Sequence, residues 1–190
     1  MLRRLAVLCA LLLCSACSEP PQKEIDRAQG AIDAARAAGA ERYAAAEFTA
    51  ATDALSQAHD AVAQRDYRTA LSRALTASER AQEAAKQAAD GKARARSEAE
   101  GASNAAAHAA QQLRTAIKSA EGQKSRAPQL AVARKTLQRV EAELQEARTH
   151  LAAGRYLEAS DALKTVIPRV NDQIRALTQA ATKPRPVRRR

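Results

Sequence analysis

The chain has 190 residues, and about a quarter of them are alanine. It contains no Trp, one Phe, three Tyr and six each of Gly and Pro, whereas the strong helix formers Ala, Leu, Glu, Gln, Lys and Arg dominate. This composition excludes a sheet protein and predicts an all-α fold of antiparallel helical hairpins, or an elongated helical bundle, with a thin alanine-rich core. The net charge of +10 is uneven, because residues 183–190 alone carry five positive charges.

The first sixteen residues have the three parts of a cleavable export signal. Residues 1–4 are short and positive, residues 5–13 are almost wholly apolar, and small residues follow. The apolar stretch of roughly a dozen residues is too short to cross a bilayer, which needs about 20. We therefore expect residues 1–16 to be removed during export, although a signal retained as an anchor is an alternative.

The sequence Leu-Cys-Ser-Ala-Cys at residues 13–17 resembles the lipobox of bacterial lipoproteins. In that motif an apolar residue and two small residues precede an invariant cysteine. Ser15 and Ala16 fill the small positions, and Cys14 stands where leucine is usual. The resemblance implies that Cys17 receives a diacylglyceryl thioether and becomes the lipid-bearing N-terminus of the mature chain. Two or three acyl chains hold a protein stably at a membrane, whereas one holds it only marginally.

The residues around the acceptor cysteine imply a location. Ser18 follows Cys17, and an Asp at this position tends to retain Gram-negative lipoproteins in the inner membrane. The absence of Asp at position 18 favours the outer membrane, with the mature chain facing the periplasm. Because the other two cysteines lie within the signal, a lipidated Cys17 leaves no thiol for a disulfide. The alternative is an ordinary secreted protein cut nearby, in which Cys17 is incidental.

Residues 17–22 contain Pro20-Pro21 and are expected to form a lipidated tether, and residues 23–90 the first helical hairpin region. A helix over residues 23–38 is predicted to end at Gly39. The next helix, over residues 41–64, has apolar residues at heptad spacing. These residues are Ala44, Phe48, Ala51, Leu55, Ala58 and Val62. A tight turn at Arg65-Asp66 then leads into a third helix, with Asp66 as its N-cap.

Residues 128–182 are predicted to form a second helical hairpin. Its first helix repeats the spacing 89 residues later, at Ala133, Leu137, Val140, Leu144, Ala147 and Leu151. Gly154 permits the turn, and Tyr156 matches Tyr67 at the start of the following helix. Two similar hairpins indicate a weak internal duplication, and their packing resembles that of tetratricopeptide repeats, although the period is not 34 residues. Pro168 is expected to kink or interrupt the last helix.

Residues 91–127 are expected to be a polar helical connector, either a mostly solvated continuation of the third helix or a frayed segment. Leu113 and Ile117 are its only large apolar residues. The tail of residues 183–190 is expected to be disordered. Its basic residues could contact anionic lipid or cell wall, and they are Lys183, Arg185, Arg188, Arg189 and Arg190. Nucleic acid is not the expected partner, because the chain is exported and the tail has no aromatic residue on which bases could stack.

Residues 27–85 resemble a family of alanine-rich helical proteins of the bacterial envelope, classed as a domain of unknown function. The resemblance is carried by the sequence AIDAARAAGAERYA at residues 31–44 and by an Asp-Tyr-x-x-Ala element at residues 66–70. Members are often lipoproteins, and some carry a peptidoglycan-binding domain after the helices, which this chain lacks. The resemblance implies a location and a fold, and it implies no activity.

The expected chemistry is non-enzymatic, with no metal and no cofactor. His59, His108 and His150 share no local ligand spacing, and the carboxylates are interleaved with Arg and Lys. We therefore expect an envelope lipoprotein that acts as a helical spacer or docks an unidentified protein partner. Two alternatives stay open, namely a structural protein that binds cell wall or anionic lipid through its tail, and an accessory subunit of an export or assembly machine. Self-association through the alanine seams also stays open.

Overall fold

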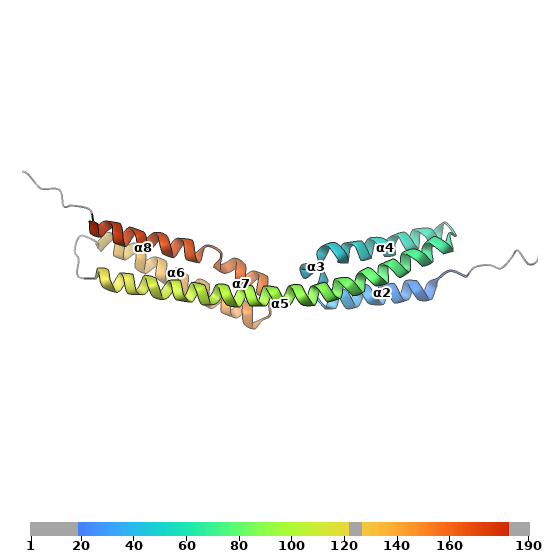
Figure 1. Ribbon diagram of the computed structural model, residues 1–190, viewed down its shortest axis with the longest axis horizontal. Helices are drawn as coiled ribbons and strands as arrows, with labels where there is room; N and C mark the ends of the chain where they lie inside the picture. The colour runs from blue at the N-terminus through green and yellow to red at the C-terminus, as the bar shows by residue number, and fades with distance from the viewer. Residues whose placement is uncertain (1–18, 122–126, 183–190) are drawn as a thin grey trace, which may run out of the picture. The chain divides into compact units, whose positions relative to one another are not determined.

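The computed structural model describes residues 19–121 and 127–182, and within these ranges the chain is almost entirely helical and contains no strand. The prediction of an all-α fold is confirmed. The chain divides into two compact units, Met1–Gly91 and Lys92–Arg190. Helix α5, Tyr67–Ala120, contributes its first part to unit 1 and the remainder to unit 2 (Figure 1).

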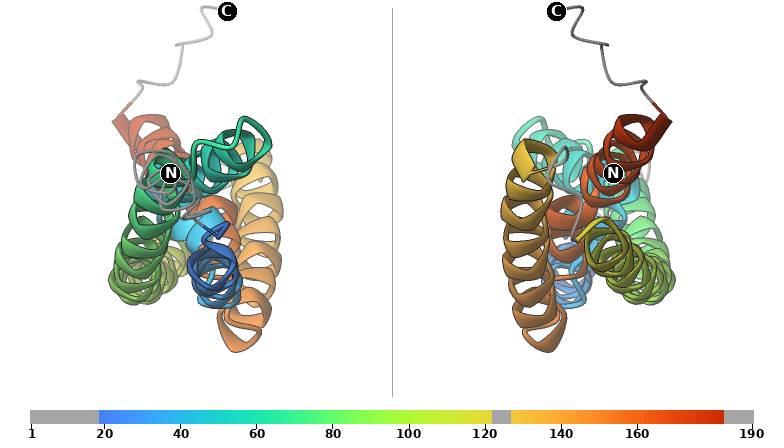
Figure 2. Two further views of the ribbon diagram at one scale, coloured as in Figure 1. Left: turned by 90° about the vertical axis from the view of Figure 1, so that its right-hand side faces the viewer. Right: turned by 90° about the vertical axis from the view of Figure 1, so that its left-hand side faces the viewer.

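Unit 1 packs α2 (Gln22–Ala37), α3 (Ala40–Tyr43), α4 (Ala45–Ala63) and the first part of α5 around one core. The left view of Figure 2 has these helices toward the viewer. Apart from alanines, the buried core residues are Ile25, Ile32, Phe48 and Leu55. Alanine lets the helices approach closely but buries little apolar area per residue, so the core is thin, as predicted.

The corner between α2 and α4 differs from the predicted single helix over residues 41–64. Gly39 ends α2 with φ 89°, as expected, and α3 then runs for one turn. Ala44 interrupts the helix with φ −145° and ψ 43°, so that α4 begins at Ala45. Alanine is the best helix former, and the sequence therefore gave no sign of this break. The close packing of Tyr43 against α5 accompanies it.

The turns before α5 and before α7 have the same backbone geometry. Arg65 has φ 60°, and Gly154, 89 residues later, has φ 70°. The N–H of the residue after each bonds a carbonyl five residues back, from Asp66 to Ala61 and from Arg155 to His150, both at 2.9 Å. This is the hydrogen-bond pattern of a Schellman motif. The internal similarity predicted from sequence therefore extends to these backbone hydrogen bonds.

Unit 2 packs the second part of α5, α6 (Ala127–Ala152), α7 (Tyr156–Leu163) and α8 (Val166–Thr182) around a second core. The right view of Figure 2 looks along α5, α6 and α8. Larger apolar residues dominate this core, and those with less than 2% exposure are Leu113, Val140, Val166 and Val170. Pro128 is the second residue of α6, where its missing N–H costs no hydrogen bond.

The segment expected to be a polar connector continues the third helix, which was one of the two expected forms, but it is not mostly solvated. As far as Ala120, it is a continuous helix with one face buried in unit 2. The buried residues are Ala106, Ala109, Ala110, Leu113, Ile117 and Ala120. An alanine face has low hydrophobicity in the sequence, and it becomes a core face here because α6 and α8 offer larger side chains opposite it.

Each unit therefore packs four helical segments, one of which is a short helix, α3 in unit 1 and α7 in unit 2. The buried face of α2 at Ile25, Ala28, Ile32 and Ala35 has the same spacing as the face of α5 at Ala110, Leu113, Ile117 and Ala120, 85 residues later. The following hairpins match at 89 residues, so the second unit has four more residues at its first corner. The similar spacing therefore extends to a further helix in each unit, which was not predicted from the sequence.

The last helical segment is interrupted, as predicted from Pro168. Helix α7 ends at Leu163, and α8 begins at Val166. Proline has no N–H to donate to the carbonyl of Lys164, four residues earlier, so the regular hydrogen-bond ladder fails there. Val166 and Val170 are both fully buried, which keeps α8 packed against the core after the break.

Candidate functional site

The residues that sequence analysis assigned to binding lie outside the described residues. These are the acceptor Cys17 and the tail residues Lys183, Arg185, Arg188, Arg189 and Arg190. The structure does place the two points from which these segments extend. Helix α2 begins at Gln22, five residues after Cys17, and α8 ends at Thr182, one residue before the tail.

The folded part of the chain begins almost directly after the acceptor position. Pro21 is buried, and its carbonyl accepts a hydrogen bond of 3.1 Å from the N–H of Ile25, itself a core residue. Five residues span at most about 18 Å when fully extended. A group attached to Cys17 is therefore held close to the start of α2.

The start of α2 and the turn between α4 and α5 lie at the same end of unit 1 (Figure 1), because α2 and α4 pack side by side in opposite directions. We call this the turn end, and define it by Arg65, Asp66, Arg68, Leu71 and Leu75. Leu71 is 38% exposed and Leu75 is 45% exposed. They are four residues apart and thus share one face of α5.

Asp66 caps α5 at this turn end, as predicted. Its Oδ1 accepts a hydrogen bond of 3.0 Å from the backbone N–H of Thr69. Hydrogen bonds from the Thr69 hydroxyl and backbone, together with the positive charge of Arg68, hold the pKa of Asp66 below its ordinary value. The carboxylate therefore remains charged and keeps the first turn of α5 in place.

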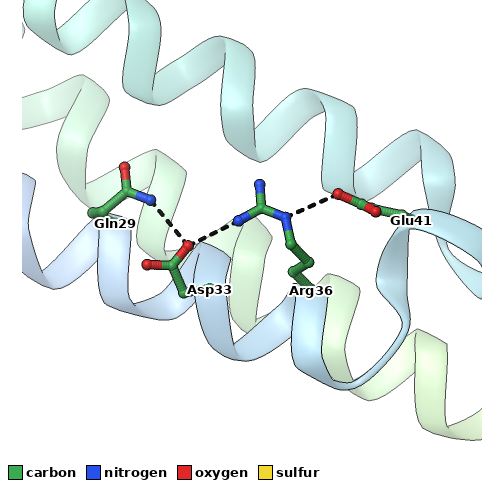
Figure 3. Close-up of polar contacts among 4 residues, drawn as sticks. All are labelled: Gln29, Asp33, Arg36 and Glu41. Atoms are coloured by element: carbon green, nitrogen blue, oxygen red, sulfur yellow. Dashed lines mark hydrogen bonds and ion pairs between the residues drawn. The ribbon is translucent and has the colours of Figure 1, made fainter.

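A network of polar side chains lies at the opposite end of unit 1, where α2 meets α3 (Figure 3). The Arg36 guanidinium donates from Nε to Glu41 Oε1 and from one terminal nitrogen to Asp33 Oδ1, both at 2.9 Å. Gln29 donates to the same Asp33 oxygen at 3.1 Å. The guanidinium also lies 5.3 Å from the centre of the Phe48 ring. These contacts tie α2 to both α3 and α4.

Arg36 is the residue that most of these contacts share. The hydrogen bond to Glu41 is the main cause that raises the pKa of Arg36. Sequence analysis did not single out Arg36 or Glu41. The spacing of three residues between Asp33 and Arg36 was the available signal, but such pairs are common on any charged helix and carry little specificity.

Gly91, within α5, has a packing role in the structure. A Cβ at this position would lie 2.9 Å from the Tyr43 carbonyl oxygen and 3.1 Å from the Tyr43 Cβ. The backbone of α3 therefore approaches α5 more closely than any other residue would allow. Gly30 and Gly101 have no such neighbour within 4 Å.

Two open grooves lie on the described surface of unit 2. One, of about 350 Å³, lies between α5 and α6, where Arg114 forms an ion pair with Glu141 across it. Another, of about 340 Å³, lies between α6 and α8. It is lined by Val132, Lys135, Thr136, Arg139 and Arg169. Arg169 bonds both carboxylate oxygens of Glu143 at 2.7 Å, so its charge is already balanced within the groove.

The ionisable residues are dispersed over helix surfaces. His59 and His108 are exposed on α4 and α5, and His150 lies at the end of α6 with Nε2 at 3.7 Å from Glu146. Across residues 19–121 and 127–182, no cluster of three or more His, Cys, Asp or Glu side chains could hold a metal ion. No helix in these ranges combines the length and apolar character needed to cross a bilayer.

Comparison with known proteins gives one match, and it covers residues 23–100. They match the model of a family described as a domain of unknown function (DUF4398). The match includes unit 1, with the Arg36 network and the turn end, and continues a short way along α5. It is wider than the 27–85 range that carried the resemblance in the sequence. No curated protein and no solved structure matches the chain.

Proposed function

We propose that the mature chain is a non-enzymatic lipoprotein of the bacterial envelope, in which two helical units form a spacer or a protein-docking module in the periplasm. The observation that carries this proposal is the lipobox-like sequence at residues 13–17, preceded by an export signal. The remaining chain fits an anchored protein, because folded structure starts five residues after Cys17.

The docking role is supported by the surface of unit 2. Leu157 at the start of α7 and Ile167 at the start of α8 are more than one-third exposed, although both are large apolar residues. The hairpin of α6 and α7 has a glycine turn followed by Tyr156, with Ala159 fully buried three residues on. This arrangement resembles tetratricopeptide hairpins, which present helix grooves to partner segments.

Lipid attachment is tested by growing the expressing cells with an alkyne fatty acid and measuring the intact mass of the full-length protein. We expect label and a mass increase on Cys17, and the loss of both in Cys17→Ser. The matched variant Cys14→Leu, which supplies the usual lipobox residue, should keep or increase labelling. An unlabelled wild-type chain cut elsewhere would refute the anchor, and fractionation of the labelled protein would identify its membrane.

Docking is tested by placing a photo-crosslinking residue at Leu157 or Ile167 in the anchored protein in cells. A single abundant partner, captured at these positions and lost when the Tyr156–Val170 segment is disrupted, would support docking. Capture of the chain by itself would indicate self-association. The absence of any protein adduct would leave a spacer as the remaining role and end the search for a partner.

A second candidate function is binding to an anionic surface through the basic tail, which has five positive charges in eight residues. The position of the tail in the chain favours this function, because residue 183 directly follows the last residue of α8. Deleting residues 183–190 should reduce binding to cell-wall sacculi and to anionic vesicles at low salt, where such attraction is strongest. Unchanged binding by the truncated chain would refute this role.

A further inference from the structure

We propose that the turn end of unit 1 is a lipid-contact surface, at which Leu71 and Leu75 enter the interfacial region of the bilayer that holds Cys17 while Arg65 and Arg68 contact lipid phosphates. This inference rests on the proposed lipid anchor. It adds a second, non-covalent contact between the protein and its membrane.

The first observation is the distance of this end from the anchor. Five residues separate Cys17 from the start of α2, and the turn between α4 and α5 lies at that same end of unit 1 (Figure 1). The tether spans at most about 18 Å, which is less than the length of α2 itself, about 24 Å. The tether alone thus keeps this end, rather than the Arg36 end, next to the headgroups.

The second observation is the apolar face itself. Leu71 and Leu75 are the large apolar residues that unit 1 leaves exposed among its described residues. Four residues apart on α5, they point to the same side, and they lie within the first three turns of that helix. An exposed leucine pair has no partner within unit 1, and the acyl region of a bilayer is an apolar environment that the anchor brings to it.

The third observation is the basic residues beside these leucines. Arg68 precedes Leu71 by three residues and thus lies on the same face of α5. Arg68 acts electrostatically on the neighbouring Asp66 carboxylate, whose pKa it lowers, but among the described residues neither Arg68 nor Arg65 is held in a close ion pair. Guanidinium groups bind phosphate in a bidentate manner, so a basic residue on each side of the turn complements phospholipid headgroups.

Arg65 also occupies a backbone conformation that favours glycine. Its φ is 60°, and the equivalent turn in unit 2 has Gly154 at the same position. A residue with a side chain in this conformation is destabilised relative to glycine. The turn of unit 1 therefore has a basic side chain at the position where the turn of unit 2 has none.

The chain has no Trp, so a single introduced Trp reports its own surroundings. The mature chain from residue 17 onward has Cys17 as its only thiol, which permits coupling to a maleimide phospholipid in vesicles of phosphatidylethanolamine and phosphatidylglycerol. The variants are Leu71→Trp and Leu75→Trp. The matched control is Ala89→Trp, exposed on the same helix about 21 Å beyond residue 75. Far-UV circular dichroism confirms that each variant keeps its helical content.

We expect the emission of Trp at positions 71 and 75 to shift to shorter wavelength and to be quenched by brominated lipid, while the control at position 89 does neither. Adding Arg65→Gln and Arg68→Gln should reduce the quenching at position 71. Absence of quenching at positions 71 and 75, or equal quenching at all three positions, would overturn the proposal. Because the coupling is chemical, this result does not depend on lipidation in cells, which the mass of Cys17 reports separately.

Discussion

The close approach of Tyr43 to Gly91 makes Gly91→Ala a sharp test of the packing in unit 1. Replacing glycine by alanine inside a helix ordinarily stabilises it by about 1 kcal/mol. Here the new Cβ would lie 2.9 Å from the Tyr43 carbonyl oxygen, and the neighbour is backbone rather than the end of a flexible side chain. Overpacking of this kind costs about 1–3 kcal/mol. The net expectation is a loss of about 0–2 kcal/mol in the free energy of unfolding.

Gly30→Ala is the matched control, because Gly30 is also helical, lies in the same unit and has nothing within 4 Å of a built Cβ. It should gain about 1 kcal/mol, so the two variants should differ by about 1–3 kcal/mol. Urea unfolding followed by far-UV circular dichroism measures both. If Gly91→Ala stabilises the protein as much as Gly30→Ala, the close packing of α3 on α5 is wrong.

Four further substitutions test other parts of the structure. Arg65→Gly should raise the free energy of unfolding by about 0.5–1 kcal/mol, because glycine adopts a positive φ without strain. Gly154→Ala should lower it by a similar amount. If thermal melts show that both substitutions change stability in the same direction, the shared turn geometry is wrong. Asp66→Ala should lower the melting temperature at neutral pH. Because the pKa of Asp66 is depressed in the folded state, its carboxylate stabilises the fold above the unfolded-state pKa of about 3.9, and this stabilisation is lost as the pH falls further. If the difference in melting temperature between wild type and variant persists in strong acid, this would argue against the cap. Leu113→Ala should cost about 2–5 kcal/mol in chemical unfolding because Leu113 is fully buried in unit 2, and a cost below 1 kcal/mol would indicate the solvated connector expected from sequence.

The sequence by itself determined the helical class, the turn positions and the residues of the first seam. Scarce glycine, proline and aromatic residues excluded sheets, and Gly39, Asp66 and Gly154 marked helix ends through their backbone preferences. The heptad spacing identified Ala51, Leu55 and other residues that are buried. These features are local, so a single sequence can report them.

The candidate anchor also came from sequence alone. The proposed export signal and the proposed acceptor Cys17 are linear motifs of the kind that enzymes recognise before a chain folds, and the described residues neither include nor position them. The same holds for the basic tail. The structure adds only the proximity of each segment to a helix end, at Gln22 and at Thr182.

Tertiary structure alone decided where the alanine faces pack. Alanine has nearly the same helix propensity and low hydrophobicity in every context, so the face containing Ala106 and Ala110 could not be distinguished from a solvated one. Its burial depends on Leu144, Val166 and Val170, which lie far away in the sequence. The break at Ala44 and the role of Gly91 arise in the same way, from contact between segments that no local preference specifies.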